Sequence, residues 1–331
     1  MLALAACQRS TETQYFEGDT EGTTYHVTVS SLPPGVTRAR AQAAIDAALA
    51  DVDRHLSTWR TDSEISRFNA SASDDWMRAS APFVTVLREA QRVARESQGA
   101  FDVTVAPLVD LWGFGMRVND PGGEPDAAEI AAARAAVGYE RLELRSTPSA
   151  VRKLAAALRI DVAGIAPGYA VDRICQAFAA MGVQDAIVEI GGEVRAWGRN
   201  PDGRPWRAAV ERPVAGERSP YTLVELDGTA VSTSGDYRDY RVVGRRRVSH
   251  TIDPRTGAPV VHDLASVTVL HASAMTADAY ATALMVLGPD EGYRYAEQHG
   301  LAVLMLERLP GRAEWRERVT PGFTRLRRPW P

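Results

Sequence analysis

Residues 185–198 read DAIVEIGGEVRAWG, and this stretch shows the pattern that decides the fold class. Two apolar, strand-like runs flank the glycine pair at its centre. Runs of similar length recur along the chain, and turn residues separate them at the spacing of hairpins. This spacing favours antiparallel pairing, because parallel strands need long crossover connections. The expected strands cover residues 23–30, 141–145, 158–164, 185–198, 206–213, 221–228, 229–235, 240–243, 248–252 and 264–271.

Segments with helical periodicity interrupt these strands. Residues 37–57 repeat apolar side chains on one face, at Ile45, Leu49, Val52 and Leu56. Residues 81–98 carry a proline in the first turn and a glycine after the end, as helices often do. Further helices are expected over residues 127–138, 167–181, 276–287 and 290–299. The sequence therefore predicts an α+β fold, with helices packed against mostly antiparallel sheets.

The composition is that of an ordinary globular protein. The 331 residues are 45% hydrophobic and 24% charged, so we expect one large domain or two closely joined halves. The net charge is -4 and the pI is about 5.9, which argues against a nucleic-acid-binding protein. No run approaches the ~20 apolar residues that are needed to cross a bilayer.

The two cysteines have different surroundings. Cys7 ends the apolar stretch MLALAAC, which resembles the lipobox of bacterial lipoproteins, although the positively charged start of such a leader is missing. The alternative is a poorly ordered terminus with a chance cysteine. Cys175 lies in an expected helix, where a cysteine is most often a small buried hydrophobe. We therefore expect a lipid anchor at Cys7 and no disulfide between the two.

The stretch SAMTADAYATALMVLG, residues 273–288, is an apolar helix with two polar side chains on one face. Thr276 is the expected N-cap, and the Gly-Pro pair after Leu287 is expected to close the helix. Asp278 and Thr282 stand four residues apart, so their side chains share a face. They can serve the helix itself, through its dipole and a bond to the preceding turn. They can also be two oxygen ligands for a hard cation.

Several other segments are more polar or richer in glycine than their surroundings. Trp59 follows the first long helix and reads most simply as a core residue. Asp102 heads an apolar segment, where it can form a turn or accept hydrogen bonds from a ligand. The turn before Pro167 leads a strand into a helix, a geometry that can bind anions. Gly191 and its neighbour can let a ligand approach the backbone or can mark a hairpin distortion. His250 ends a strand-like run, and a lone histidine there is more often structural than catalytic.

These segments form a recognisable series. The chain contains, in this order, GTTYHV, STWRTDSEISRFN, GAFDVTVAPLVDLWGFG, GIAPGYAVD, EIGGEVRAWG, TSGDYR, SHTIDPRTGAP and TADAYATALMVLG. Their order and spacing resemble those of the ApbE family, the FAD:protein FMN transferases. The resemblance runs over residues 21–305, nearly the whole chain, and eight ordered motifs are far more specific than one glycine-rich motif.

The resemblance implies a metal site, a cofactor site and a base, in two intimately joined halves around a cofactor cleft. Magnesium would be bound by Asp278, Thr282 and the backbone carbonyl of Gly164. His250 matches the histidine of the family's SH motif, a proposed base. The FAD contacts correspond to Trp59, which would stack on a ring of the cofactor, and to Ala100, Phe101, Asp102, Pro167, Thr251 and Ile252.

Two positions depart from the family pattern. Many members carry lysine where this chain has Pro167, and Lys153 is the only lysine in the sequence. Proline has neither a charge nor an N–H, so a side-chain contact to the dinucleotide is lost there. Glu21 stands where the family usually has methionine, and a carboxylate beside an anionic cofactor is unfavourable unless it faces solvent. Either change can weaken FAD binding, but neither removes the metal site or His250.

The function that the resemblance implies is the magnesium-dependent transfer of FMN from FAD to a threonine or serine of a target flavoprotein, with release of AMP. Targets in the family are flavin-carrying subunits of membrane redox complexes outside the cytoplasm. Together with Cys7, this places the chain on the periplasmic side of the bacterial inner membrane, with membrane contact only through the anchor. The alternatives are a magnesium-dependent FAD pyrophosphatase, which gives free FMN and AMP, and a non-catalytic flavin-binding lipoprotein.

The domain organisation follows from the extent of the motifs. Residues 1–20 are expected to be a lipoprotein signal remnant and an N-terminal linker. Residues 21–310 are expected to form one transferase domain, and residues 311–331, which end in RRPWP, a C-terminal tail.

Overall fold

The computed structural model describes residues 12–20, 22–115, 123–216, 218–237, 240–243, 246–309, 311 and 314–330. The predictions for Cys7 and Glu21 therefore lie outside the described residues. Cys175 is buried and is a free cysteine, as expected. In the described part of the chain, no helix is long and apolar enough to cross a membrane.

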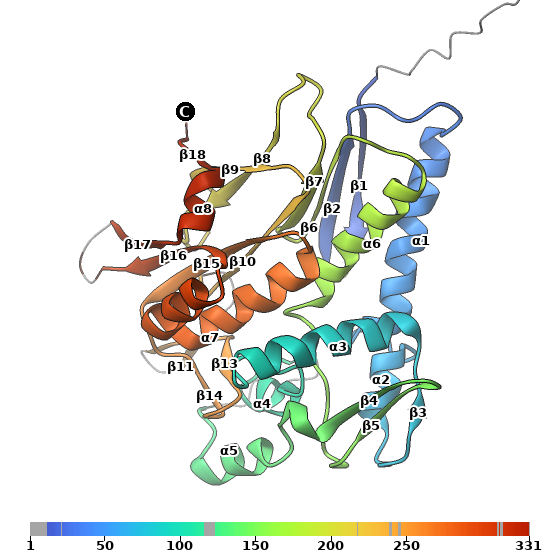
Figure 1. Cartoon of the computed structure of the whole chain (residues 1–331). Coiled ribbons are helices and arrows are strands. Elements are labelled where there is room, and N and C mark those ends of the chain that lie inside the picture. The colour runs from blue at the N-terminus through green and yellow to red at the C-terminus, as the bar shows by residue number, and fades with distance from the viewer. Residues whose placement is uncertain are drawn as a thin grey trace, which may run out of the picture.

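Eight antiparallel strands form the central sheet of the molecule (Figure 1). Their order across the sheet is β1 (Gln14–Thr20), β2 (Thr23–Val29), β6 (Ala186–Ile190), β7 (Glu193–Trp197), β10 (Thr229–Gly235), β15 (Leu264–His271), β16 (Ala302–Arg308) and β17 (Trp315–Val319). Strand β15 is buried along nearly its whole length, because it lies inside the sheet and under a helix. The predicted α+β fold with antiparallel pairing is confirmed.

The glycine pair at the centre of residues 185–198 is a hairpin turn. Ile190 pairs with Glu193, so Gly191 and Gly192 are the two loop residues between β6 and β7. Their φ angles are 62° and 114°, in the region that favours glycine, as tight hairpin turns require. The structure therefore supports the hairpin alternative for this pair.

The helices of the described chain are α1 (Arg38–Leu56), α2 (Glu64–Ala70), α3 (Ala81–Glu96), α4 (Ala106–Leu111), α5 (Ala127–Arg134), α6 (Ala166–Ala180), α7 (Ala274–Gln298) and α8 (Pro321–Leu326), with a 3₁₀ turn at Tyr139–Arg141. Four of them form two layers over one face of the central sheet, and α8 packs on the opposite face. Helices α6 and α7 pack on the sheet and on each other, while α1 contacts α6 and α3 contacts α7 (Figure 1). The α6–α7 pair is therefore buried between the sheet and the outer helices.

Helix α1 shows how the sequence determines an element. The Thr37 hydroxyl accepts a hydrogen bond from the Arg40 N–H and caps the helix. The four apolar residues predicted to share a face are all buried, at Ile45, Leu49, Val52 and Leu56. Each of these side chains stabilises the fold by roughly 1.5–3 kcal/mol relative to exposure.

Smaller sheets and hairpins surround this framework. One sheet contains β18 (Arg327–Arg328), β9 (Pro220–Leu226) and β8 (Trp206–Glu211), and a second contains β3 (Met77–Arg78), β5 (Ser149–Lys153) and β4 (Leu142–Ser146). Two hairpins follow each other along the chain, β11 (Tyr240–Val243) with β12 (Arg246–Ser249), and β13 (Ile252–Asp253) with β14 (Ala258–Pro259). All of these pairs are antiparallel.

The predicted strand over residues 158–164 is wrong. Only Arg159 makes a ladder contact there, a single parallel bridge to Val105. The backbone of Ile160 is instead hydrogen-bonded by the side-chain amide of Asn69, whose Oδ1 accepts from the Ile160 N–H at 2.7 Å and whose Nδ2 donates to the Ile160 carbonyl at 2.8 Å. The Asp161 carboxylate then accepts from the Ala163 N–H and turns the chain. Side chains therefore replace the strand partner.

The predicted C-terminal tail also needs correction. Within residues 311–331, strand β17 pairs with β16 in the central sheet, and β18 pairs with β9. The Phe323 side chain of α8 is fully buried in a second apolar core, with Trp206, Leu226 and Leu306. Residues 315–328 are therefore part of the folded body. The many arginines made this segment look like an exposed tail in the sequence, because only one of its faces is apolar.

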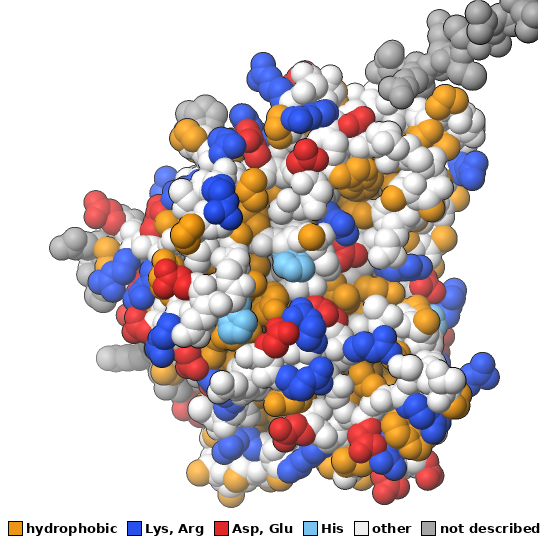
Figure 2. Space-filling model, in the orientation of Figure 1, with side chains coloured by type: hydrophobic (Ala, Val, Ile, Leu, Met, Phe, Trp, Pro, Cys, Tyr) orange, Lys and Arg blue, Asp and Glu red, His pale blue; other side chains and the backbone are white. Residues whose placement is uncertain are grey.

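Charged side chains of both signs lie on the surface of the molecule. On the face shown in Figure 2, acidic and basic side chains are intermingled, with no single basic patch. Many arginines have acidic partners, among them Arg308 with Asp236 and Arg318 with Glu307. The arginine-rich composition therefore does not give this face a field that would attract a polyanion.

Candidate functional site

Helix α7 carries the predicted metal-binding face, but it begins earlier than the sequence suggested. Ser273, and not Thr276, is the N-cap, since its Oγ accepts a hydrogen bond from the Thr276 N–H. Gly288 leaves the helical conformation, with φ 76° and ψ -176°, and kinks the helix. Asp278 is therefore the fifth helical residue, beyond the first turn in which the dipole acts. The dipole of its own helix does not explain this carboxylate.

The Asp278 carboxylate faces the start of α6. It is buried, and its Oδ2 accepts a hydrogen bond of 3.2 Å from the Gly168 N–H. Gly168 is the third residue of α6, where the N–H has no partner within the helix. Pro167 stands just before it, at a position where a missing N–H costs nothing to the helix. The structure therefore brings Asp278 to the turn that contains Pro167.

Thr282 lies one helical turn after Asp278 and faces the same turn. A Cβ atom at Gly164 would lie 2.7 Å from Thr282 Oγ1, so only glycine lets the backbone approach this hydroxyl so closely. A second hydroxyl comes from β10, where Ser234 Oγ lies 3.3 Å from Thr282 Oγ1. Oxygen atoms from α7 and β10 therefore lie near the turn that leads into α6.

This set of donors suits a hard cation. It offers one carboxylate, hydroxyl groups and backbone carbonyls, and Mg²⁺ commonly takes one or two protein carboxylates and fills its other positions with water and substrate phosphates. Among the described residues, no group of three or more His, Cys, Asp and Glu side chains could bind a metal.

His250 lies in a break between two hairpins. The predicted strand over residues 248–252 is interrupted, because Ser249 Oγ accepts a hydrogen bond from the Thr251 N–H and bends the chain. The His250 ring is half-buried and packs edge-to-face with Phe114, with 6.3 Å between the ring centroids. Thr251 and Ile252 are buried behind it.

Asp161 connects His250 electrostatically to the turn before α6. Burial raises the pKa of the Asp161 carboxyl, the Ala163 N–H lowers it, and the charges of Asp110 and His250 raise and lower it respectively. Asp161 stands three residues before Gly164, so this interaction involves the turn that leads into α6.

The predicted cofactor segment Ala100–Asp102 runs beside the same turn. The Asp161 N–H donates a 2.7 Å hydrogen bond to the Val103 carbonyl, which joins the two segments. Ala100 and Phe101 are buried. The Asp102 carboxylate is also buried and accepts hydrogen bonds from the Thr104 N–H, the Thr104 hydroxyl and the Tyr139 N–H. These contacts support the turn alternative for Asp102, and its contact with FAD stays a prediction.

Trp59 is 69% exposed, so the interpretation of this residue as part of the core is wrong. It lies in the loop between α1 and α2, and α2 reaches the turn before α6 through Asn69 and Ile160. An exposed indole is available to a ligand. Its stacking on the cofactor stays a prediction.

Residues 160–168 are thus the meeting point of the motifs. The motif that contains Trp59 contacts Ile160, the segment after Ala100 contacts Asp161, and helix α7 contacts Gly164 and Gly168. Sequence reasoning missed Ser234, Gly168 and Asp172 at this place. Ser234 was visible only as one hydroxyl among several in AVSTSG. Gly168 acts through its backbone, and Asp172 acts through a carboxylate whose partners lie about 100 residues away in the sequence.

Comparison with known proteins agrees with this arrangement. The model of the ApbE family matches residues 22–305. The FAD:protein FMN transferase of Haemophilus influenzae is 40% identical over 93% of this chain and 90% of its own length, and that of Vibrio cholerae is 41% identical over 92% and 91%. The crystal structure of the flavin transferase ApbE from Vibrio cholerae matches 95% of this chain and 99% of its own, with a TM-score of 0.86 and 39% identity. This chain therefore belongs to the ApbE family and is an enzyme of the transferase class.

Proposed function

We propose that this chain transfers the FMN half of FAD to a threonine or serine hydroxyl of a target protein. The names of the relatives support this reaction. The observation that carries it in this chain is the gathering of Gly164, Asp278 and Thr282 at the turn before α6. In the transfer step, the hydroxyl oxygen forms a bond to the phosphorus of the FMN half, the P–O bond to AMP breaks, and AMP leaves.

Asp278, Thr282 and the Gly164 carbonyl would hold Mg²⁺ beside the pyrophosphate. A bound magnesium ion neutralises the negative charge that grows on the pyrophosphate as the bond to AMP breaks. Asp278 is suited to this task because it lies beyond the first turn of α7, so the dipole of that helix does not account for its carboxylate. Gly164 has no side chain, so its backbone can lie close to Thr282.

His250 would take the proton of the incoming hydroxyl. Imidazole is the side chain that most often serves as a general base, and the His250 ring is half-buried. Trp59 would stack on a ring of FAD, and the buried segment Ala100–Asp102 would form a wall of the cofactor site.

One experiment separates this reaction from its rivals. A threonine-containing peptide from a candidate target is incubated with the protein, FAD and magnesium, and the products are identified by mass spectrometry. A covalent FMN adduct with free AMP is the expected result. Free FMN and AMP without an adduct would identify an FAD pyrophosphatase, and intact FAD a flavin-binding protein, so either result would contradict the proposal.

We also propose that the protein is lipid-anchored at Cys7 on the periplasmic side of the inner membrane, where it would meet flavin-carrying subunits of membrane redox complexes. The LAAC stretch supports this location. Expressed from its full-length gene, the wild type should incorporate a radioactive fatty acid, and Cys7→Ser should not. An unlabelled wild type in the soluble cytoplasmic fraction would contradict the location without touching the reaction.

A further inference from the structure

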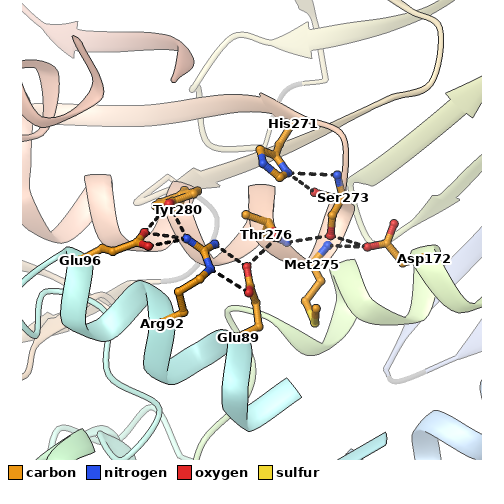
Figure 3. Close-up of polar contacts among 9 residues, drawn as sticks. All are labelled: Glu89, Arg92, Glu96, Asp172, His271, Ser273, Met275, Thr276 and Tyr280. Carbon is orange, nitrogen blue, oxygen red and sulfur yellow. Dashed lines mark hydrogen bonds and ion pairs between the residues drawn. The ribbon is translucent and has the colours of Figure 1, made fainter. Parts of the chain in front are cut away.

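The first turn of α7 is capped by a side chain from another helix. The first N–H groups of a helix have no partner within it. Here the Asp172 carboxylate of α6 accepts a hydrogen bond of 3.1 Å from the Ala274 N–H. It also accepts one of 3.2 Å from the Met275 N–H (Figure 3). The Ser273 hydroxyl donates to the same carboxylate at 2.6 Å. Asp172 thus binds the N-cap residue and the first two helical residues of α7.

The start of α6 is capped in the reverse direction. Ile165 is its N-cap residue and provides no side-chain hydrogen bond. The Gly168 N–H, in the first turn, donates instead to Asp278 of α7. Each helix therefore supplies a carboxylate to the N-terminus of the other, and one of these carboxylates, Asp278, is the proposed metal ligand.

The two caps lie on either side of a direct backbone contact. A Cβ atom at Gly168 would lie 2.4 Å from the Ala274 carbonyl oxygen and 2.8 Å from the Met275 nitrogen. No side chain separates the helices here, so a shift of α7 along α6 would break both caps together. The relative position of Asp278 and the turn at Gly164 is therefore tied to the cap at Asp172.

Asp172 is itself held in place. Its side chain is 5% exposed, and the Arg195 guanidinium of β7 donates to its Oδ1 at 2.5 Å. A buried carboxylate needs such partners, because burial without them is costly. Arg195 thus holds Asp172 against the central sheet. Asp172 in turn holds the first residues of α7 through its hydrogen bonds.

A second set of contacts holds the other side of the same turns. The Thr276 hydroxyl donates to Glu89 of α3 at 2.7 Å, and the Tyr280 hydroxyl donates to Glu96 at 2.6 Å (Figure 3). These contacts join α7 to the outer helix layer and do not reach α6. The contacts described here that set the start of α7 against α6 are therefore those at Asp172 and at Gly168.

We propose that Asp172 is a positioning residue for the magnesium site: by capping α7 from α6, it sets Asp278 and Thr282 against the Gly164 carbonyl. This inference rests on the proposed function, because it takes Asp278 and Thr282 as metal ligands. Asp172 acts through α7 and touches no reacting atom. Its loss should weaken metal binding more than it weakens the fold.

The test uses Asp172→Asn, which keeps the size of the side chain but loses its charge and one of its two acceptor oxygens. Calorimetric titration with Mg²⁺ in the presence of FAD should show an affinity lowered by roughly fivefold or more, the factor that corresponds to the loss of a helix cap. Hydrogen exchange at the amides of Ala274 and Met275 should speed up by a similar factor. Raising the Mg²⁺ concentration should restore most of the FMN transfer.

Asp126→Asn is the matched control. Asp126 caps α5 by accepting from the Ala128 and Glu129 N–H groups, and α5 makes no contact with α6 or α7 that the site uses. This variant loses the same kind of cap and should keep the Mg²⁺ affinity of the wild type. If Asp172→Asn does not fold, Ser273→Ala removes a donor to Asp172 and the N-cap of α7 while leaving the ion pair with Arg195, and it should shift the affinity in the same direction.

Two results would overturn the inference, and they differ in what else they overturn. A folded Asp172→Asn or Ser273→Ala protein with faster exchange in α7 but wild-type Mg²⁺ affinity would make the cap merely structural. A wild type that binds no Mg²⁺ at all would remove the metal site, and with it both the proposed mechanism and the role of Asp172.

Discussion

Asp278 serves two purposes at the scale of a single residue, and substitutions can separate them. Asn at this position keeps an oxygen that can accept the Gly168 N–H but loses the charge that a cation needs. Ala loses both. We expect Asp278→Asn and Asp278→Ala to lose FMN transfer alike, and only Asp278→Ala to lose a further ~1 kcal/mol of stability, the value of a helix cap. Transfer assays and urea unfolding measure the two effects. Full transfer by Asp278→Asn in chelator-treated buffer would contradict the metal role.

His250 is the second residue whose role a substitution can decide. A general base contributes ~10²–10⁴-fold to the rate, so His250→Asn should slow FMN transfer by that order while FAD still binds. If the histidine only shaped the break between β12 and β13, the variant would lose FAD affinity or thermal stability and keep its rate at saturating FAD. Titration with FAD followed by single-turnover transfer distinguishes the two. A normal rate at saturation would remove His250 from the mechanism.

At the scale of elements, the kink in α7 depends on a histidine outside the helix. In a straight helix the Met285 carbonyl would accept from the N–H of residue 289, but Pro289 has none. The His262 Nε2–H takes its place, 2.8 Å from the Met285 oxygen, and the His262 ring covers Gly288 at the kink. The other ring nitrogen, Nδ1, is buried without a hydrogen-bond partner among the described residues. The bond therefore requires only the neutral ring.

This arrangement predicts how stability depends on pH. Burial lowers the pKa of His262 below its usual value of about 6.5, so the unfolded chain binds the proton more readily than the folded one. The neutral ring stabilises the fold fully above that usual value, and this contribution is lost as the pH falls through the lowered pKa. His262→Gln cannot titrate, so the melting temperature of this variant should fall less than that of the wild type between about pH 7 and pH 5. Parallel curves for the two proteins would rule out this role of His262.

The elements themselves differ in how far the sequence predicts them. Residues 37–57 and residues 185–198 were predictable, because an apolar face and a glycine-pair turn are local signals. Residues 158–164 look like a strand, yet Asn69, far away in the sequence, takes the backbone of Ile160. The N-cap of α7 was predicted at Thr276 but is Ser273. The two hydroxyls lie three residues apart, and the contact with Asp172 favours Ser273. Local patterns fail where a distant side chain supplies the hydrogen bond.

At the scale of the whole molecule, the candidate site is a product of the fold. The eight motifs predicted which segments of the chain form the site. Composition and periodicity did not show that these segments meet at residues 160–168. That meeting depends on the buried α6–α7 pair and on close backbone contact at Gly164 and Gly168. Such contacts are tertiary, so the sequence could suggest Asp278 and Thr282 as ligands without showing what positions them.

The C-terminal segment gives a prediction for the molecule as a whole. Residues 315–328 complete the central sheet and cover the second apolar core, in which Phe323 is fully buried. A chain that ends at residue 310 should therefore lose cooperative urea unfolding or fail to fold, whereas a chain that ends at residue 328 should behave as the wild type. The point variant Phe323→Ala should lose about 3–5 kcal/mol of unfolding free energy, as expected for a large side chain removed from a core.

Trp330 is the matched aromatic control for Phe323, since it lies just after the same segment and is 51% exposed. Trp330→Ala should change the unfolding free energy by no more than about 0.5 kcal/mol, the range of most surface substitutions. The two aromatic residues stand seven positions apart, so sequence position alone does not distinguish them, and burial does. If the chain that ends at residue 310 unfolded at the urea concentration of the wild type, residues 315–328 would not be needed for folding. Strand β16 would then form the edge of the central sheet without β17.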